Sequence, residues 1–472
     1  MSKHYLESVF SPASVAVIFD QAYLGIGTQV LANLEQAGFA GQVQAVSAEV
    51  DTIAGRPTQP DLGAIAAPVE LAVLAVRAEA QPALLRSCSK AGVRAAVILS
   101  GGFSEAQQHG RAIQDELVEI ARSCEIALVG PRCLGVIRPR SKLNASSARS
   151  PVRQGKMALV TQSGALCSAL LDWADSKGMG FSAVASLGAS SDVKLGDMLD
   201  YLAQDPYTDS ILLYVERVAN ARRFLSGLRA AARLKPVVVI RSGRNPAGER
   251  AAPGHIGTPV GSDTAFDAAI RRAGAVRVNS VSQLVAAATI LASGARTRGS
   301  NLAVITNGGG PGVMAADWAG SAGVPLSTLS DATVKALGAV LPPHWSHADP
   351  VDILDDADEE RYRTATELLL ADDGVHGLLV LLTPQGFTDP AACAEGLVAG
   401  VGKTRKPVLA SWMGASLVEQ GRQVLSAAGI PHFMSPEAGV DAFAYLASYR
   451  ANQSALLQAP EPLSAHRAPD TY

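Results

Sequence analysis

His255 is the side chain in this sequence best suited to covalent chemistry. It lies in a Gly- and Pro-rich stretch, residues 244–263, between an apolar strand pattern at 236–241 and an amphipathic helix pattern. We therefore expect an irregular loop that presents the imidazole at a surface. A neutral imidazole is nucleophilic near pH 7, because its unperturbed pKa is about 6.5, and it can carry a phosphoryl or an acyl group.

Two other loops follow strand patterns and could act together with this histidine. Glu216 follows the run 211–215, and a carboxylate at the end of a parallel strand can fix the tautomer of an imidazole or can simply be solvated. Ser163 follows the strand pattern 157–161, and Gly164 and Ala165 open a helix whose first amides and dipole could hold a phosphate. The alternative is that Ser163 serves only as a helix N-cap.

Two glycine-rich turns are weaker candidates. Gly25 and Gly27 follow the first strand pattern and could let the backbone approach a phosphate at a helix beginning near Thr28, although they could equally be structural turns. The run 306–312, Thr-Asn-Gly-Gly-Gly-Pro-Gly, predicts close approach of a ligand or another backbone. No Lys-Ser or Lys-Thr follows these glycines, so a P-loop is excluded.

We expect neither a metal site nor disulfides. The five cysteines, at positions 88, 124, 133, 167 and 393, form no CxxC pair, which indicates reduced thiols. His344 and His347 are three residues apart, but no third ligand is evident. The amino terminus lacks a signal-peptide pattern, and no apolar stretch reaches about 18 residues. The sequence therefore predicts a cytoplasmic protein without a membrane span.

Length and composition describe a globular protein of two or three domains. The chain has 472 residues, more than the roughly 250–300 that one hydrophobic core serves. Hydrophobic residues make up 48% and charged residues 18% of the chain, with no long run of either sign. A net charge of -3 gives no basic surface for nucleic acid or anionic lipid, so we expect neither as a partner.

Short β-branched runs alternate with longer segments of helical period, which predicts an α/β fold with parallel sheets. A Rossmann-like domain is expected at 1–150, with a polar stretch at 138–151 separating it from the next strand. Two further doubly wound domains are expected at 151–296 and 297–456, joined by a polar linker at 293–300. Residues 457–472 are rich in Pro and Ala and are expected to form a disordered tail.

A series of motifs runs through the chain in a characteristic order: Gly130-Pro-Arg-Cys-Leu-Gly135, Thr161-Gln-Ser-Gly-Ala165, Asp205-Pro, Tyr214-Val-Glu216, Lys235-Pro-Val-Val-Val239, the His255 stretch, Thr306-Asn-Gly-Gly-Gly-Pro-Gly312, Asp349-Pro-Val-Asp352 and Ser411-Trp-Met-Gly414. Together they resemble the α portion of NDP-forming acyl-CoA synthetases, relatives of the succinyl-CoA synthetase α subunit. The resemblance extends from residue 5 to about 450 and is most specific between 160 and 263.

The resemblance implies a CoA-binding Rossmann-like domain followed by two flavodoxin-like domains. His255 matches the phosphorylated histidine of the family and Glu216 the carboxylate that orients it. Ser163, Gly164 and Ala165 match the helix terminus that receives the phosphate. Gly25 and Gly27 then belong to the CoA site.

The resemblance also implies an activity and its partners. Acyl-CoA, phosphate and NDP would be interconverted with a carboxylic acid, CoA and NTP, by way of acyl phosphate and a phosphohistidine. The nucleotide, ADP/ATP or GDP/GTP with Mg, would bind to an ATP-grasp β subunit, and the assembly would be oligomeric. The implied ligands of this chain are CoA and a small carboxylic acid.

The sequence departs from the family pattern at several positions. Phe19-Asp-Gln21 stands where Gly-Ala-Ser is usual, and Arg77 where proline is usual. Arg132 and Ala189 each replace an asparagine, and Pro253-Gly254 replaces Ala-Ser. The alternative to a working ligase is therefore a catalytically impaired CoA-binding or regulatory module, related to synthetases fused to an acetyltransferase.

Overall fold

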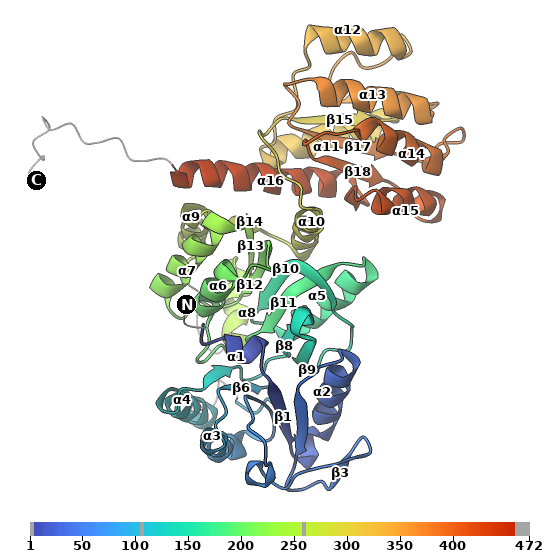
Figure 1. The fold of residues 1–472 in the computed structure, drawn as a ribbon. Coiled ribbons are helices and arrows are strands. Elements are labelled where there is room, and N and C mark those ends of the chain that lie inside the picture. Colours follow the sequence, from blue (N-terminus) through green and yellow to red (C-terminus); the bar gives the residue numbers. More distant parts are fainter. Residues whose placement is uncertain (1–3, 104–107, 257–260, 458–472) are drawn as a thin grey trace, which may run out of the picture.

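The computed structural model describes residues 4–103, 108–256 and 261–457. Within these ranges three mainly parallel sheets follow one another along the chain, each flanked by helices (Figure 1). The first sheet lies at the bottom of Figure 1, the second in the middle and the third at the top. The predicted fold class, a Rossmann-like domain followed by two flavodoxin-like domains, is confirmed. The limits of the three domains stay a prediction.

The first sheet has five parallel strands in the order β2-β1-β5-β6-β7. Every residue of β1 and β5 is buried, as expected for central strands covered on both faces. The strand order reverses between β1 and β5, and open α/β sheets bind ligands beyond the carboxyl ends of the strands at such a point. The elements are α1 (Glu7–Phe10), β1 (Ser14–Phe19), η1 (Gln21–Tyr23), α2 (Leu24–Gln36), β2 (Gln42–Val46), β3 (Thr52–Ile53), β4 (Arg56–Pro57), η2 (Leu62–Ala64), β5 (Leu71–Ala75), η3 (Ala78–Ala80), α3 (Gln81–Lys90), β6 (Ala95–Ile98), α4 (Gln108–Ser123) and β7 (Ala127–Val129).

The second sheet has the order β14-β13-β12-β10-β11-β8-β9, in which β8 and β9 are antiparallel additions. Its parallel part has the flavodoxin order, with the reversal between β10 and β12. The elements are β8 (Gly135–Arg138), η4 (Pro139–Ser141), β9 (Leu143–Ser146), β10 (Arg153–Thr161), α5 (Gly164–Ser176), β11 (Gly180–Ser186), α6 (Leu195–Gln204), β12 (Ser210–Val215), α7 (Ala221–Leu234), β13 (Val237–Arg241), α8 (Pro246–Ile256), α9 (Asp263–Ala273), β14 (Val276–Val278) and α10 (Val281–Ala292).

The third sheet, β16-β15-β17-β18-β19, repeats the flavodoxin order. Its last helix, α16, continues past the sheet and contacts the second domain, where the Asn452 side chain donates to the Ala275 carbonyl at 3.0 Å. The elements are β15 (Leu302–Thr306), α11 (Gly309–Ala322), α12 (Asp331–Val340), β16 (Val351–Asp352), α13 (Glu359–Ala371), β17 (Gly377–Leu382), α14 (Pro390–Val401), β18 (Val408–Trp412), η5 (Ser416–Val418), α15 (Glu419–Ala427), β19 (His432–Phe433) and α16 (Pro436–Leu457). The predicted tail at 458–472 lies outside the described residues.

The sequence prediction was wrong in the stretch before His255, where the structure has a helix rather than a loop. The α8 helix runs from Pro246 to Ile256. Proline is favoured in the first turn of a helix because its φ angle is already helical, and Glu249 adds a favourable acid in the first turn. The Glu249 amide donates to the Asn245 carbonyl at 2.8 Å, which closes the first turn.

The polar stretch at 138–151 contains strand β9 and the end of β8, which sequence reasoning missed. Three of its polar side chains, those of Arg138, Asn144 and Ser146, are buried, whereas Arg140 and Lys142 are exposed. The polar composition of the stretch therefore hid the two strands. The Arg138 guanidinium donates to the two carboxylate oxygens of Asp205 at 2.8 and 2.7 Å. Both side chains are buried. The ion pair therefore fixes β8 against the end of α6.

Replacing Asp205 by asparagine is expected to destabilise the second domain by about 3–5 kcal/mol, because it leaves the Arg138 charge buried without its partner. Equilibrium unfolding in urea would measure this loss. The matched control is Asp209→Asn, which removes the exposed partner of Lys156 at 3.0 Å and should cost below about 1 kcal/mol. Equal losses of stability in the two variants would contradict a stabilising role of the buried Arg138–Asp205 ion pair.

The same ion pair predicts a pH dependence of stability. Burial raises the pKa of Asp205, but hydrogen bonds from Arg138 and Thr208 outweigh this and lower the pKa overall. A carboxyl whose folded pKa is lowered stabilises the fold at pH values above its unfolded pKa, about 3.9. The contribution is lost as the pH falls through the lower, folded value.

Candidate functional site

The candidate site lies at the carboxyl ends of β10 and β12, where the order of the second sheet reverses. These strands pair in parallel, with Thr161 opposite Tyr214. Ser163 is the second residue after β10 and Glu216 is the first residue after β12. The structure therefore brings both predicted residues to one edge of one sheet, the edge at which open α/β sheets bind ligands.

Gln162 joins the two turns, and sequence reasoning missed it. Its side-chain carbonyl accepts the backbone amides of Glu216 at 2.8 Å and of Arg217 at 3.0 Å. Gln162 and Glu216 are both buried. Because a buried amide left without an acceptor costs free energy, this contact fixes the turn that carries Glu216 to the turn that carries Ser163.

Ser163 is the N-cap of α5. Its hydroxyl accepts the Leu166 amide at 3.3 Å, and its own amide donates to the Thr161 hydroxyl at 2.9 Å. The N-cap role considered in the sequence analysis is thus present. It does not exclude phosphate binding, because the amides of Gly164 and Ala165 lie in the first turn and have no acceptor within the helix.

The structure places His255 on α8 but does not describe its side chain. The α8 helix follows β13, which is adjacent to β12, with Val215 opposite Arg241. The chain after β13 therefore begins at the same sheet edge as Glu216. On the far side of residues 257–260, the Arg241 guanidinium donates to the carbonyls of Gly261 at 2.9 Å and Ser262 at 3.1 Å. Both flanks of the His255 segment are thus connected to β13.

Tyr214 is a neutral hydroxyl beside Glu216. Burial raises the pKa of Tyr214, a hydrogen bond with Ser242 lowers it, and the neighbouring Glu216 carboxylate raises it again, with a net increase. Tyr214 therefore stays protonated at neutral pH and can interact with a carboxylate without adding charge.

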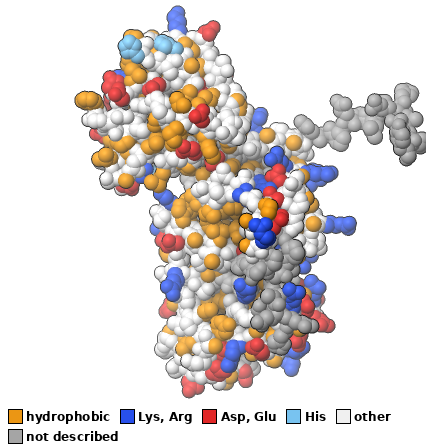
Figure 2. Space-filling view, turned by 180° about the vertical axis from the view of Figure 1, so that it is seen from behind, with side chains coloured by type: hydrophobic (Ala, Val, Ile, Leu, Met, Phe, Trp, Pro, Cys, Tyr) orange, Lys and Arg blue, Asp and Glu red, His pale blue; other side chains and the backbone are white. Residues whose placement is uncertain are grey.

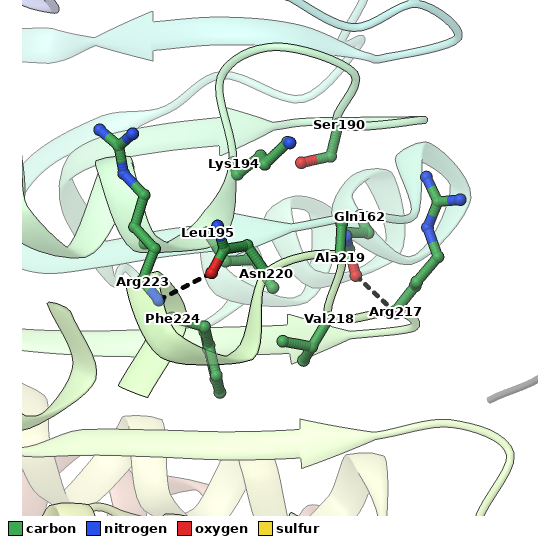
Figure 3. A pocket seen from close by; sticks show the side chains of 11 residues that line it. Gln162, Ser190, Lys194, Leu195, Arg217, Val218, Ala219, Asn220, Arg223 and Phe224 are labelled. Atoms are coloured by element: carbon green, nitrogen blue, oxygen red, sulfur yellow. Dashed lines mark hydrogen bonds between the residues drawn. The ribbon is translucent and has the colours of Figure 1, made fainter. Parts of the chain in front are cut away.

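A small cavity opens beside Gln162, and Figure 3 shows the side chains that line it. Three of them are cations that the sequence analysis did not single out. Two of the cations are anchored: Arg217 donates to the Ala189 carbonyl at 3.1 Å, and Arg223 forms an ion pair with Asp197. The polar lining residues are Gln162, Ser190, Lys194, Arg217, Asn220 and Arg223. The cavity thus gives the site a positive wall that favours an anionic ligand.

The loop after β11 joins this edge to the first domain. The Ala189 amide donates to the Pro131 carbonyl at 2.9 Å, and a side chain on Gly188 would place its Cβ 2.1 Å from the same oxygen. Only glycine allows this approach, since Gly188 also has a φ of +53°. Ala189 makes this contact through its backbone, so the contact does not depend on the asparagine side chain usual in the family.

Gly25 and Gly27 do not lie at the start of a helix near Thr28, because α2 already begins at Leu24. Gly27 is buried, and a Cβ there would lie 2.8 Å from the Phe19 ring. Its small size therefore serves helix–strand packing. Gly25 is exposed, and a Cβ added there would meet no atom within 4 Å. The contact of Gly25 with a phosphate stays a prediction.

The third domain repeats the turn of the second. The Thr306 hydroxyl accepts the Gly308 amide at 3.1 Å, as Thr161 does for Ser163. Asn307 reaches across to the next strand, where its carbonyl accepts the Thr383 amide at 2.8 Å, as Gln162 does for Glu216. The glycine-rich run therefore builds the same turn, with Gly312 packed closely against Thr306.

A larger cleft of about 500 Å³ separates the second and third domains, near the narrowing of the molecule in Figure 2. Trp173, Lys177 and Met179 line it on one side and Phe433 on the other. Lys177 and Met179 immediately precede β11, so the cleft lies at the amino edge of the second sheet. It is therefore separate from the edge that carries Ser163 and Glu216.

Across the described part of the chain, no group of three or more His, Cys, Asp or Glu side chains is arranged to hold a metal ion. In the third domain, the His347 ring contacts the Pro343 carbonyl at 3.1 Å. Among the helices of residues 4–103, 108–256 and 261–457, none is long and apolar enough to cross a bilayer. The five cysteines are free.

Comparison with known proteins gives the family. Three family models match in order: a CoA binding domain over residues 25–139, a succinyl-CoA ligase like flavodoxin domain over 154–291 and a Ligase-CoA domain over 302–458. The α subunit of acetate–CoA ligase (ADP-forming) I from Pyrococcus furiosus is 34% identical over 93% of this chain and 97% of its own length. The chain belongs to the ADP-forming acyl-CoA ligase family. It corresponds to the α part of these ligases.

The structure agrees with this assignment. An acetyl-coenzyme A synthetase from Ca. Korarchaeum cryptofilum, solved with phosphate and ADP, superposes with a TM-score of 0.89 at 30% identity, covering 96% of this chain and 99% of that one. Acetate–CoA ligase (ADP-forming) I from Archaeoglobus fulgidus is 37% identical over 94% of this chain, which spans 64% of that relative. Because these relatives are ligases, the non-catalytic alternative is not favoured.

Proposed function

We propose that this chain is the α part of an NDP-forming acyl-CoA ligase that transfers phosphate through His255. The supporting observation is the contact of Gln162 with the Glu216 and Arg217 amides, which joins the turn that carries Glu216 to the turn that carries Ser163, the N-cap of α5. An amide-rich helix terminus suits a phosphate, and a carboxylate suits an imidazole that must attack phosphorus with one fixed nitrogen. The ligases among the relatives support the same reaction.

The proposed reaction has three steps. Phosphate attacks the acyl carbon of acyl-CoA, so the thioester bond breaks and CoA leaves as the thiol with acyl phosphate as the product. The neutral His255 nitrogen then attacks the phosphorus of acyl phosphate and releases the carboxylate. Finally an oxygen of NDP attacks the phosphohistidine, which returns the free imidazole and forms NTP. Each step is reversible, so the chain would also serve the synthesis of acyl-CoA from the carboxylic acid, CoA and NTP.

Within this scheme the residues have separate roles. Gly164 and Ala165 would bind the phosphoryl oxygens at the α5 terminus, and phosphoryl transfer depends mainly on such positioning and charge stabilisation. Glu216 would orient the histidine. Lys194 and Arg217 would keep the pocket positive. The first domain, at 1–150, would bind CoA, which the match to a CoA binding domain supports.

The remaining parts of the reaction would come from a partner. We propose an ATP-grasp β subunit that holds ADP/ATP or GDP/GTP with Mg, in an oligomeric cytoplasmic ligase. The relatives described as α subunits support a partner chain. We also propose the domain limits 151–296 and 297–456 for the two flavodoxin-like domains, since the matched family models fall within or close to them.

Phosphorylation by acyl phosphate tests the proposal without the partner. The purified chain is incubated with [³²P]acetyl phosphate, and the protein-bound label is measured. We expect close to one phosphate per chain, stable in alkali and lost in acid, as for a phosphoramidate. Addition of CoA should remove the label with formation of acetyl-CoA when acetate is present. A chain that acquires no acid-labile phosphate would overturn the proposed function.

A further inference from the structure

Two departures from the family pattern in the first domain are in direct contact. Asp20 follows β1 and Arg77 follows β5, so they face each other where the order of the first sheet reverses. One carboxylate oxygen of Asp20 accepts the Arg77 backbone amide at 2.9 Å and lies 3.1 Å from the Arg77 Nε. The two residues are 57 positions apart in the sequence, so the fold alone brings them together.

The backbone at position 77 shows that the two changes depend on each other. Arg77 has a φ of -56° and a ψ of 148°, which is a conformation that proline also adopts. The proline usual in the family would therefore fit this turn, but it has no N–H. With proline at 77, Asp20 would lose both the amide donor at this position and its counter-ion. The arginine supplies both.

Glu49, from the loop after β2, completes the cluster. One of its carboxylate oxygens accepts the Gln21 amide at 2.9 Å, and the other forms an ion pair with the Arg77 guanidinium. The second oxygen of Asp20 accepts the Tyr23 amide at 3.1 Å. Two carboxylates thus accept three backbone amides at the carboxyl ends of β1 and β5.

Two of these amides, those of Gln21 and Tyr23, lie between β1 and α2, where a Rossmann-like sheet holds a ligand phosphate. Backbone N–H groups between the first strand and its helix, at the reversal of strand order, normally bind a diphosphate. Here carboxylates of the chain itself use them. Asp20 is nearly buried, with 9% of its side chain exposed, whereas Arg77 and Glu49 are half-exposed. The two acids and one base leave a charge of -1 at the turn.

We propose that Asp20 and Glu49, held by Arg77, form an internal anion that occupies the phosphate-binding turn of the first domain and sets its affinity for CoA. The CoA diphosphate must displace a carboxylate from these amides and approach a site of like charge. The inference rests on the proposed role of the first domain in CoA binding. Asp20 and Arg77 are thus affinity-setting residues that act as a pair.

The test restores the family residues at both positions. The double variant Asp20→Ala/Arg77→Pro removes the internal anion and keeps a backbone that fits the turn. Calorimetric titration of the full chain with CoA should give a Kd at least about ten-fold lower than in the unaltered chain, because a like charge beside the diphosphate is gone. Glu49→Gln should change the Kd in the same direction by a smaller factor.

Two comparisons separate this effect from net charge and from folding. Asp51→Asn removes one negative charge from the loop that also carries Glu49, but the Asp51 side chain is exposed. It should leave the Kd for CoA within about two-fold of that of the unaltered chain. Arg77→Pro alone removes the amide and the guanidinium that Arg77 presents to Asp20 and should lower the melting temperature, whereas the double variant should recover it. Circular dichroism would confirm that each variant is folded.

The outcomes distinguish the inference from the proposed function. A double variant that binds CoA as the unaltered chain does, or more weakly, overturns the internal anion and leaves CoA binding intact. If neither chain binds CoA, both the internal anion and the CoA role of the first domain are wrong. Labelling of His255 by acetyl phosphate does not involve CoA, so it would still report on the second domain.

Discussion

Replacing His255 by asparagine is expected to reduce phosphate labelling of the chain to background, a loss of at least about a thousand-fold. Asparagine keeps polarity and approximate size but has no nucleophilic nitrogen, and removal of a covalent nucleophile abolishes the intermediate rather than slowing it. The measurement is the acid-labile, alkali-stable ³²P bound after incubation with [³²P]acetyl phosphate. Ligase turnover with a β partner should fall by the same factor.

The matched control for this substitution is His344→Asn, on the exposed surface of the third domain. It makes the same chemical change away from the sheet edge that carries Ser163 and Glu216, and labelling should stay within about two-fold of the unaltered chain. Circular dichroism should show that both variants are folded. Labelling that persists in His255→Asn, or that disappears in His344→Asn, would assign the phosphate to another residue.

The sequence predicted the architecture because the central strands are uniformly apolar. The runs at 211–215 and 236–241 became β12 and β13 within one residue, since strands buried on both faces need few polar positions. Placement of Ser163 and Glu216 at one edge also followed from the parallel order. Gln162 could not be inferred in the same way, because its role depends on a contact with the backbone of another loop. The signal available was the similarity of Thr161-Gln162 to Thr306-Asn307.

The features that the sequence did not predict have a common physical cause. Each depends on a polar group whose partner is distant in the sequence. From the sequence, Arg138 belonged to a polar stretch between two domains. In the structure it pairs in the interior with Asp205, which is 67 residues away. Likewise Asp20 and Arg77 looked like two separate departures from the family pattern. Only the fold shows that each compensates for the other. Local patterns report on burial of apolar surface, whereas such pairs are decided by tertiary contacts.

Glu216→Gln is expected to slow phosphorylation of His255 by about a hundred- to ten-thousand-fold, the range of effects when an imidazole loses its carboxylate partner. Glutamine is nearly isosteric. The turn should remain in place, because Gln162 contacts the backbone amides of Glu216 and Arg217 and not the Glu216 side chain. The loss would therefore report on orientation of the histidine. Rapid-quench labelling with acetyl phosphate measures the rate.

The pH dependence of the same rate separates orientation from a structural effect. A carboxylate partner stabilises the imidazolium, which is not nucleophilic, so its removal should move the acidic limb of the rate–pH profile to lower pH. A variant that merely misfolds would lose amplitude at every pH without moving this limb. Glu249→Gln, which removes the same charge from the first turn of α8, should leave both the rate and the limb unchanged. A slowed Glu216→Gln enzyme with an unmoved limb would mean that Glu216 shapes the turn and does not contact the histidine.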